Sequence, residues 1–380
     1  MAPIVVIGTG LAGFNLVKEF RKHDAETPVV MLTSDDGRNY SKPMLSNGLA
    51  RNKTADELVM ASPEQTAAAL NVTVRPGVSV TAIDRAAKQV VLGDERLDYS
   101  QLVLACGADV FRPQLEGDGQ DAVFSINDLT DYARFRSALE GRKSVLVMGG
   151  GLIGCEFAND MAQAGIQVHV VEPMGRCLPL LVPEAASQAV SAGLGALGVS
   201  FHFGPFVQRV DRHGEGVRAT LSDGATVDVD LVLSAVGLRP RIALAAEAGL
   251  AVDRGVQVDR QLRTSDPQIF ALGDCAEVDG HVLPYLLPLM ASARALAKTL
   301  AGTPTDVSYG VMPITIKTPA CPVVCVVAPR GTAGHWQVEA DGHHVKALFR
   351  DEQGQLHGYA LTGDACSEKM ALNKDMPALF

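Results

Sequence analysis

Two stretches of the chain repeat one order of apolar and polar positions. Each begins with a short apolar run, IVVI at residues 4–7 and VLVM at residues 145–148, and continues through a group of glycines into apolar residues at helical spacing. A second apolar run follows each helical pattern. Short runs without polar positions are typical of strands buried on both faces of a parallel sheet. The pattern therefore predicts strand, turn, helix and strand, twice.

The glycines in both turns have the spacing G-x-G-x-x-G. The first glycine permits a tight turn, the second lets the backbone approach a pyrophosphate, and the third lets the helix lie close to its strand with its N-terminus facing the anion. We therefore predict two dinucleotide sites, the alternative being two purely structural strand–helix–strand units. The candidate residues are Gly8, Thr9, Gly10, Leu11, Ala12 and Gly13 in the first turn, and Gly149, Gly151 and Gly154 in the second.

Acidic residues follow the second strand of each unit, where a ribose hydroxyl would be bound. In the second unit the strand of residues 167–171 leads to Glu172, about 20 residues beyond the turn, as the dinucleotide fingerprint requires. In the first unit the strand starting at Pro28 leads to a polar group of residues. Asp35 is the preferred ribose ligand there, and Asp36 and Ser34 remain alternatives.

The likeness between the two units extends beyond their turns. Each is followed by hairpin signals, at residues 93–94 and 223–224, and then by a near-repeated strand, LVLACG at 102–107 and LVLSAVG at 231–237. A duplicated unit explains this repetition better than chance does. Further on, the strand predicted at residues 268–272 places Asp274 at its carboxyl end, where it suits a sugar hydroxyl or, equally, an ordinary turn.

The last part of the chain changes character. Runs rich in β-branched residues, such as 313–316 and 323–327, predict an antiparallel domain without a nucleotide turn. We therefore predict an α/β protein with two Rossmann-like dinucleotide-binding domains and a small C-terminal α+β domain. The boundaries are 1–108 with 239–311 for a discontinuous first domain, 109–238 for the second, and 312–380 for the third.

Composition restricts the possible functions. With 380 residues, 47% of them hydrophobic, the chain has room for two or three cores. A net charge of -10 and the lack of a basic block argue against nucleic acid as a partner. No apolar run is long enough to span a bilayer, and residues 1–13 lead directly into a strand and turn instead of forming a signal peptide. We therefore expect a cytoplasmic protein that does not insert into membranes.

The cysteines and histidines indicate neither a disulfide framework nor a metal site. The seven cysteines are scattered and never form C-x-x-C, and the nine histidines lack metal-ligand spacing. Cys321 and Cys325 are predicted to lie on one face of a strand, too far apart for a redox pair, and to have a structural role. No metal is assigned.

The two glycine turns, the two near-repeated strands and the stretch TSDPQIFALGDCAE resemble the two-dinucleotide-binding-domain flavoprotein reductases related to glutathione reductase. The resemblance covers essentially the whole chain. It implies FAD in the first turn, NAD(P)H in the second, Asp274 on the flavin ribityl chain, and a C-terminal interface domain. Glu172 favours NADH over NADPH, because a carboxylate would repel a 2′-phosphate. Where the disulfide reductases of this family carry a redox-active cysteine pair, this chain has Asn39 to Pro43 and no cysteine.

Within that family, four segments are most similar to the bacterial rubredoxin–NAD+ reductases: DDGRNYSKPMLSNG, GGGLIGCEFAND, INDLTDYARFR and IKTPACP. By their own chemistry, Lys42 is an exposed loop lysine and Glu156 a helical glutamate. The resemblance makes these two the catalytic residues, an ion pair beside the flavin on the nicotinamide side. It also implies an FAD site that includes Thr33, Ser34, Lys42, Val80, Glu156, Asp274 and Lys317.

The function implied by the resemblance is NADH-dependent reduction of rubredoxin through FAD, one electron at a time, in a chain such as alkane hydroxylation. The alternatives are a ferredoxin reductase component of an oxygenase and a slow-turnover flavoprotein that senses NADH. A monomer or weak dimer is expected. Because rubredoxins as a family are acidic, docking to this acidic chain requires local basic residues. The candidates are Arg38, Lys42, Arg51, Lys53, Lys317, Lys369 and Lys374.

Overall fold

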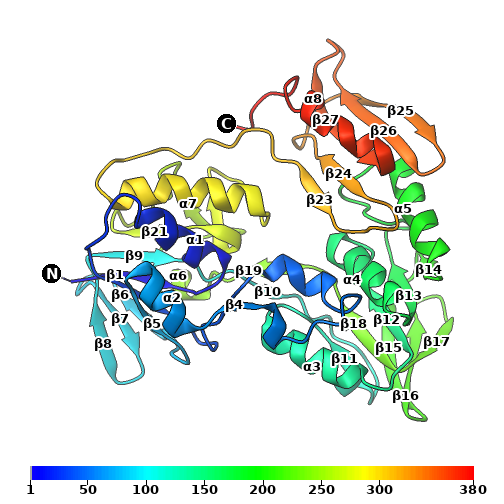
Figure 1. Cartoon of the computed structure of the whole chain (residues 1–380), viewed down its shortest axis with the longest axis horizontal. Coiled ribbons are helices and arrows are strands. Elements are labelled where there is room, and N and C mark those ends of the chain that lie inside the picture. The colour runs from blue at the N-terminus through cyan, green and yellow to red at the C-terminus, as the bar shows by residue number, and fades with distance from the viewer. Residues whose placement is uncertain (1) are drawn as a thin grey trace.

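The computed structural model describes residues 2–380, which form two α/β bodies and a smaller C-terminal body (Figure 1). The first body is built on a five-stranded parallel sheet with the order β21-β9-β1-β2-β5. Its central strand is apolar at all four positions and buried at all four, as expected for a strand covered on both faces. The strands are β1 (Ile4–Ile7), β2 (Val29–Leu32), β5 (Thr73–Arg75), β9 (Gln101–Leu104) and β21 (Ile269–Ala271).

Helices α1 and α7 pack against each other beside this sheet (Figure 1). Their apolar faces pack with the strands in one core. Burial of one face explains why the apolar residues of α1 recur at helical spacing, as the sequence predicts. A three-stranded antiparallel meander, β6-β7-β8, belongs to the same body. The elements are α1 (Leu11–Phe20), α2 (Pro63–Leu70), α6 (Ala243–Glu247), α7 (Leu286–Leu300), β6 (Ala82–Asp84), β7 (Gln89–Leu92), β8 (Glu95–Asp98), β20 (Val256–Val258), β22 (Ala276–Val278) and η4 (Gly273–Cys275).

The second body repeats this design with the parallel sheet β11-β18-β12-β13-β14 and the antiparallel meander β15-β16-β17. The duplication predicted from the sequence is therefore present. Its elements are η3 (Gln120–Ala122), β11 (Val123–Phe124), α3 (Leu129–Leu139), β12 (Ser144–Met148), α4 (Leu152–Gln163), β13 (Gln167–Glu172), α5 (Glu184–Ala196), β14 (Ser200–Phe203), β15 (Val207–His213), β16 (Gly216–Leu221), β17 (Thr226–Val229) and β18 (Leu231–Ser234).

Two connectors link the bodies. The outgoing strand β10 (Ala108–Val110) and the returning strand β19 (Leu238–Pro240) pair antiparallel with each other. A loop of the first body reaches across to α3 and α4 of the second. It contains β3 (Asn39–Tyr40), η1 (Lys42–Asn47), η2 (Asp56–Leu58) and β4 (Val59–Ala61).

The C-terminal body is an antiparallel sheet with the order β23-β24-β27-β26-β25. One face packs on α5, and its buried residues join the core of the second body. Only Cys325 of the expected cysteine pair lies on a strand, because β24 starts at Val323, beyond Cys321. The elements are β23 (Ile314–Ile316), β24 (Val323–Val326), β25 (His335–Asp341), β26 (His344–Arg350), β27 (Leu356–Thr362), η5 (Gly363–Glu368) and α8 (Lys369–Leu372).

The fold class predicted from the sequence is confirmed. Strand β21 joins β9 of the first sheet although 164 positions separate their ends, as a discontinuous first domain requires (269 minus 104, less one). The domain boundaries at residues 108, 238 and 311 stay predictions. No helix within residues 2–380 is long and apolar enough to cross a bilayer.

Candidate active site

The first glycine turn lies between β1 and α1 and has the geometry of a pyrophosphate loop. Gly8 has a φ of 117°, and a side chain there would collide with the carbonyl oxygen of Ala105. A side chain at Gly13 would collide with the carbonyl oxygen of Gly8. Gly10, the N-cap of α1, has no atom near its would-be Cβ and no side-chain cap. The turn therefore offers free N–H groups to an anion in open space, which fits a dinucleotide.

The second turn, between β12 and α4, has the same three features. Gly149 has a φ of 99° and lies against the carbonyl oxygen of Ala235, and a side chain at Gly154 would collide with the carbonyl oxygen of Gly149. Gly151, the N-cap of α4, again faces open space and makes no side-chain cap bond. Both turns thus have the close contacts and the open approach that the G-x-G-x-x-G spacing predicts.

Glu172 ends β13 beside the second turn, with only 6% of its surface exposed. Its Oε2 accepts a hydrogen bond of 2.7 Å from the Gly150 N–H, and its Oε1 accepts one of 2.8 Å from the Met174 N–H. Because two backbone donors hold the carboxylate in one orientation, each oxygen keeps a lone pair for a further donor. The ribose role of Glu172 stays a prediction, and this geometry suits it.

Three polar residues after β2 were alternatives for the first ribose. Asp35 accepts hydrogen bonds from the Thr33 hydroxyl at 2.7 Å and from the Gly37 N–H at 2.9 Å, both through Oδ1. The Thr9 hydroxyl of the glycine turn also donates to it at 3.4 Å. Asp36 instead forms an ion pair with Arg38 at 2.7 Å. Asp35 is therefore the acid beside the turn, and its Oδ2 has no protein donor within residues 2–380.

Lys42 and Asp274 approach one another between the two α/β bodies. The Lys42 Nζ donates a 2.7 Å hydrogen bond to Asn127 Oδ1, and Asn127 Nδ2 donates to the Ala108 carbonyl at 2.9 Å. Burial lowers the pKa of Lys42, and the nearby Asp274 charge opposes that shift. Burial likewise raises the pKa of Asp274, and Lys42 opposes it. The two groups thus favour each other's charged form.

The expected ion pair between Lys42 and Glu156 is wrong. Glu156, on the second turn of α4, is 1% exposed and accepts a 2.6 Å hydrogen bond from the Ser46 hydroxyl. Its cationic partner is Lys317, which follows β23 and binds it through both Nζ and a backbone N–H at 2.8 Å. The physical reason is that α4 turns this side chain toward the C-terminal body, while Lys42 is engaged by Asn127.

Two polar residues of α4 that the sequence did not single out also join the bodies. Asp160 accepts backbone hydrogen bonds from Leu49 at 2.9 Å and Ala50 at 3.0 Å, and Asn159 accepts one from Ala320 at 3.1 Å. Both are buried on α4. The available signal was their spacing from Glu156, three and four residues on, which places all three on one helical face.

The remaining candidates have simpler surroundings. Val80 is half-buried against the first core, and its implied contact with FAD stays a prediction. All seven cysteines are free thiols, and burial raises the pKa of Cys321 to about 11 and that of Cys325 to about 12. Such thiols are poor nucleophiles at neutral pH. Within residues 2–380 no three His, Cys, Asp or Glu side chains gather as metal ligands would.

Two pyrophosphate loops on duplicated sheets, with a polar site between them, define the class of two-nucleotide oxidoreductases. Comparison with known proteins agrees. The family model for pyridine nucleotide-disulphide oxidoreductase matches residues 2–297, and the model for the rubredoxin binding C-terminal domain matches residues 306–376. The chain belongs to the pyridine nucleotide-disulphide oxidoreductase family, in the group of the rubredoxin-NAD(+) reductases, as the motifs indicated.

The relatives cover the full length of the chain. It is 64% identical over 381 residues to rubredoxin-NAD(+) reductase of Alcanivorax borkumensis, with 100% of both chains covered. The protein of the same name from Acinetobacter baylyi is 40% identical over 391 residues, covering 100% of this chain and 99% of that one. Among solved structures, the ferredoxin reductase for the CYP199A2 system of Rhodopseudomonas palustris has a TM-score of 0.90 at 25% identity and covers 99% of this chain and 96% of that one.

Proposed function

We propose that this protein is an NADH-dependent flavoprotein reductase that transfers electrons through FAD to rubredoxin, one at a time. The observation that carries the proposal is the combination of two pyrophosphate loops with a C-terminal domain that matches the rubredoxin-binding model over residues 306–376. The full-length relatives at 64% and 40% identity bear the same activity in their names.

Each of the two cofactors would be bound by its own glycine turn and acidic residue. The turn of Gly8 to Gly13 and Asp35 would hold the adenosine half of FAD, and the turn of Gly149 to Gly154 with Glu172 would hold NADH. Bound FAD supplies a hydride acceptor for NADH and a carrier that releases single electrons. Asp274 would bind the ribityl chain, and Lys42 would lie near the flavin as a cation.

Helix α7 adds a second source of positive potential. It starts beside η4, which contains Asp274, and its N-cap Tyr285 makes no side-chain cap bond. The free N–H groups at a helix N-terminus stabilise negative charge. We therefore propose that this end of α7 stabilises the anionic reduced cofactor. Lys317 and Glu156, already paired with each other, would support the site from the other side.

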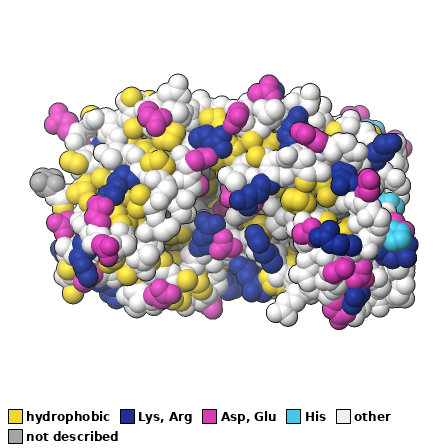
Figure 2. Space-filling model, turned by 90° about the horizontal axis from the view of Figure 1, so that it is seen from below, with side chains coloured by type: hydrophobic (Ala, Val, Ile, Leu, Met, Phe, Trp, Pro, Cys, Tyr) yellow, Lys and Arg dark blue, Asp and Glu magenta, His cyan; other side chains and the backbone are white. Residues whose placement is uncertain are grey.

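Rubredoxin is expected to dock through residues whose charge is not already neutralised. Arg38, Lys53 and Lys317 form ion pairs with Asp56, Glu57 and Glu156, respectively. Figure 2 shows that Lys and Arg side chains gather near the middle of one face. Within residues 2–380, the other four basic candidates make no ion pair: Lys42, whose ammonium group donates to the neutral Asn127 side chain, and Arg51, Lys369 and Lys374.

The test is acceptor-dependent turnover. NADH-reduced protein, mixed anaerobically with rubredoxins and ferredoxins in a stopped-flow instrument, is expected to reoxidise fastest with a rubredoxin. Faster reoxidation by a ferredoxin would move the assignment to a ferredoxin reductase, the class of the similar Rhodopseudomonas palustris structure. Slow reoxidation with every acceptor would favour an NADH sensor. A cytoplasmic location and a monomer or weak dimer stay predictions.

A further inference from the structure

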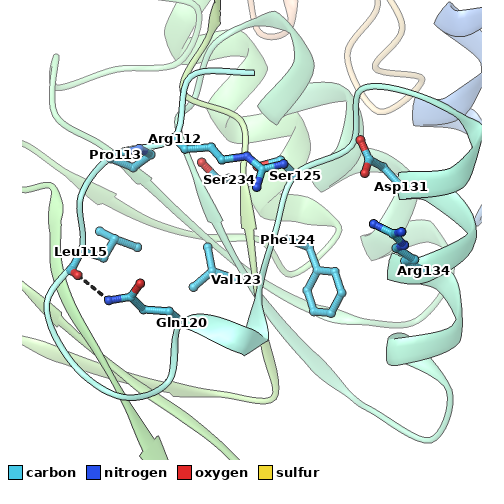
Figure 3. Close-up of a pocket in the computed structure, with 10 residues that line it drawn as sticks. All are labelled: Arg112, Pro113, Leu115, Gln120, Val123, Phe124, Ser125, Asp131, Arg134 and Ser234. Atoms are coloured by element: carbon cyan, nitrogen blue, oxygen red, sulfur yellow. Dashed lines mark hydrogen bonds between the residues drawn. The ribbon is translucent and has the colours of Figure 1, made fainter. Parts of the chain in front are cut away.

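A cavity of about 330 Å³ lies at the edge of the second sheet, beside β11 (Figure 3). No residue of either glycine turn lines it, and neither do Lys42, Glu156 or Asp274. Its volume is at the lower end of the range for small-molecule sites, which is about 300–1,000 Å³. The proposed reductase function gives this cavity no role.

The floor of the cavity contains a buried polar atom that lacks a partner. Ser234, the last residue of β18, is 7% exposed, and its Oγ makes no hydrogen bond within residues 2–380. Figure 3 shows the side chain among the residues that line the cavity. A buried hydroxyl without a partner is unfavourable, so it points to a ligand or water that supplies the missing hydrogen bond.

Two arginines at the mouth are also unpaired. Arg112 follows the connector strand β10, Arg134 lies on α3, and neither makes a hydrogen bond or an ion pair with any residue from 2 to 380. Most arginines near carboxylates in this protein are paired, as Arg241 is with Asp109 at 2.7 Å. Two free guanidinium groups from different elements at one cavity form the donor arrangement that suits a phosphate.

One carboxylate lines the same cavity. Asp131 is held through Oδ2 by the Asn127 N–H at 3.0 Å, and burial raises its pKa while Arg112 and Arg134 oppose that shift. Two arginines and one carboxylate leave the site with one net positive charge, which favours a dianion over a monoanion. Apolar walls, including Val123 and Phe124, complete the cavity.

We propose that this cavity binds a small phosphomonoester. Its phosphate would be held by the guanidinium groups of Arg112 and Arg134, the Ser234 hydroxyl would donate to an oxygen of the ligand, and a compact apolar body would contact Phe124. The site would adjoin the second glycine turn, because Ser234 pairs with Met148 just before that turn, but it shares no lining residue with either turn. It lies where both connectors meet the second body, since Ser234 is followed three residues later by Gly237, whose carbonyl accepts the Phe111 N–H at 2.9 Å.

The probe is phenyl phosphate, titrated by calorimetry into the full-length protein loaded with FAD and saturated with NAD+. Saturable binding is expected under these conditions, because the nucleotide turns are occupied. Arg112→Gln and Ser234→Ala should each weaken it about tenfold, the loss typical of one charge-assisted or buried hydrogen bond. Arg330→Gln, which alters an exposed arginine outside the cavity, is the matched control and should bind like the unmodified protein.

The possible results separate the alternatives. No saturable binding, or equal affinity in Arg112→Gln and Arg330→Gln, overturns the site. Binding that occurs in a parallel titration without NAD+ but not in its presence assigns the probe to a nucleotide turn and also overturns the site. Benzoate that binds as tightly as phenyl phosphate overturns the choice of a phosphate. Ser234→Val, which replaces the hydroxyl with methyl groups, should weaken binding at least as much as Ser234→Ala. It therefore tests the serine separately from the two arginines.

Discussion

The interaction between Glu156 and Lys317 yields the most specific prediction. Glu156 is almost fully buried at 1% exposure, whereas the Lys317 side chain is 29% exposed. Replacing Lys317 with Met leaves a buried carboxylate with only the Ser46 hydroxyl and the residue 317 N–H as donors. Replacing Glu156 with Gln leaves a lysine that can reach water. The first change should therefore destabilise the protein more than the second.

The magnitude follows from burial. Removing one partner of a buried pair costs roughly 3–5 kcal/mol. Because Lys317 is 29% exposed and thus partly solvated, we expect about 2 kcal/mol for Lys317→Met and about 1 kcal/mol for Glu156→Gln. The double variant should cost less than the sum by about 1 kcal/mol, since the second change removes a group that has already lost its partner.

The assay uses the single tryptophan of the chain. Trp336 lies on β25, stacks edge-to-face on Phe349 at 5.4 Å, and packs against the core shared with the second body. Its fluorescence during urea unfolding therefore reports the unfolding of the C-terminal body, to which Lys317 also belongs. The control cycle pairs Glu156→Gln with Lys42→Met, which share no contact and should add within about 0.5 kcal/mol. Coupling to Lys42 instead of Lys317 would refute the assigned pair.

Four further predictions concern catalysis. The protein should prefer NADH strongly to NADPH, because Glu172 would repel a 2′-phosphate, and Glu172→Ala should reduce the ratio of the two kcat/KM values about tenfold or more. One equivalent of NADH should bleach the flavin in an anaerobic titration, because residues 39–43, where the disulfide reductases of this family carry their redox-active pair, contain no cysteine. The rate of flavin reduction should fall as pH rises through the pKa of Lys42, which burial lowers, because the ammonium charge exists only below that pKa. The KM for rubredoxin should rise with ionic strength, and Lys374→Glu should weaken only that step.

Each of these predictions has an opposing result. Equal efficiency with NADH and NADPH would remove Glu172 from the ribose site. Uptake of two equivalents of NADH per flavin would indicate a second redox centre. If the rate of flavin reduction still falls at high pH in Lys42→Met, another group is responsible for that pH dependence. A rubredoxin step that is insensitive to salt and to Lys374→Glu, with Arg330→Glu as the control for net charge, would contradict docking through basic residues.

Much of this protein could be predicted from the order of its residues, because the signals are local. A buried strand, a glycine turn and a helix occupy residues 4–20 in the first unit and 144–163 in the second. The collisions at Gly8 and Gly149 show why no other residue fits there. The duplication, the antiparallel C-terminal sheet, the acids that follow β2 and the acid that ends β13 are predictable in the same way. Each depends on neighbours within one supersecondary unit.

Only the tertiary structure decided which distant side chains meet. Glu156 binds Lys317, 161 positions away, and Lys42 binds Asn127, 85 positions away. A lysine has the same charge and reach wherever it stands, so the choice between Lys42 and Lys317 depends on how the C-terminal body packs on α5 and which face of α4 it covers. The cavity beside β11 has the same origin. Its arginines and its serine come from a connector, a helix and a strand end, and no local pattern in the sequence brings these three together.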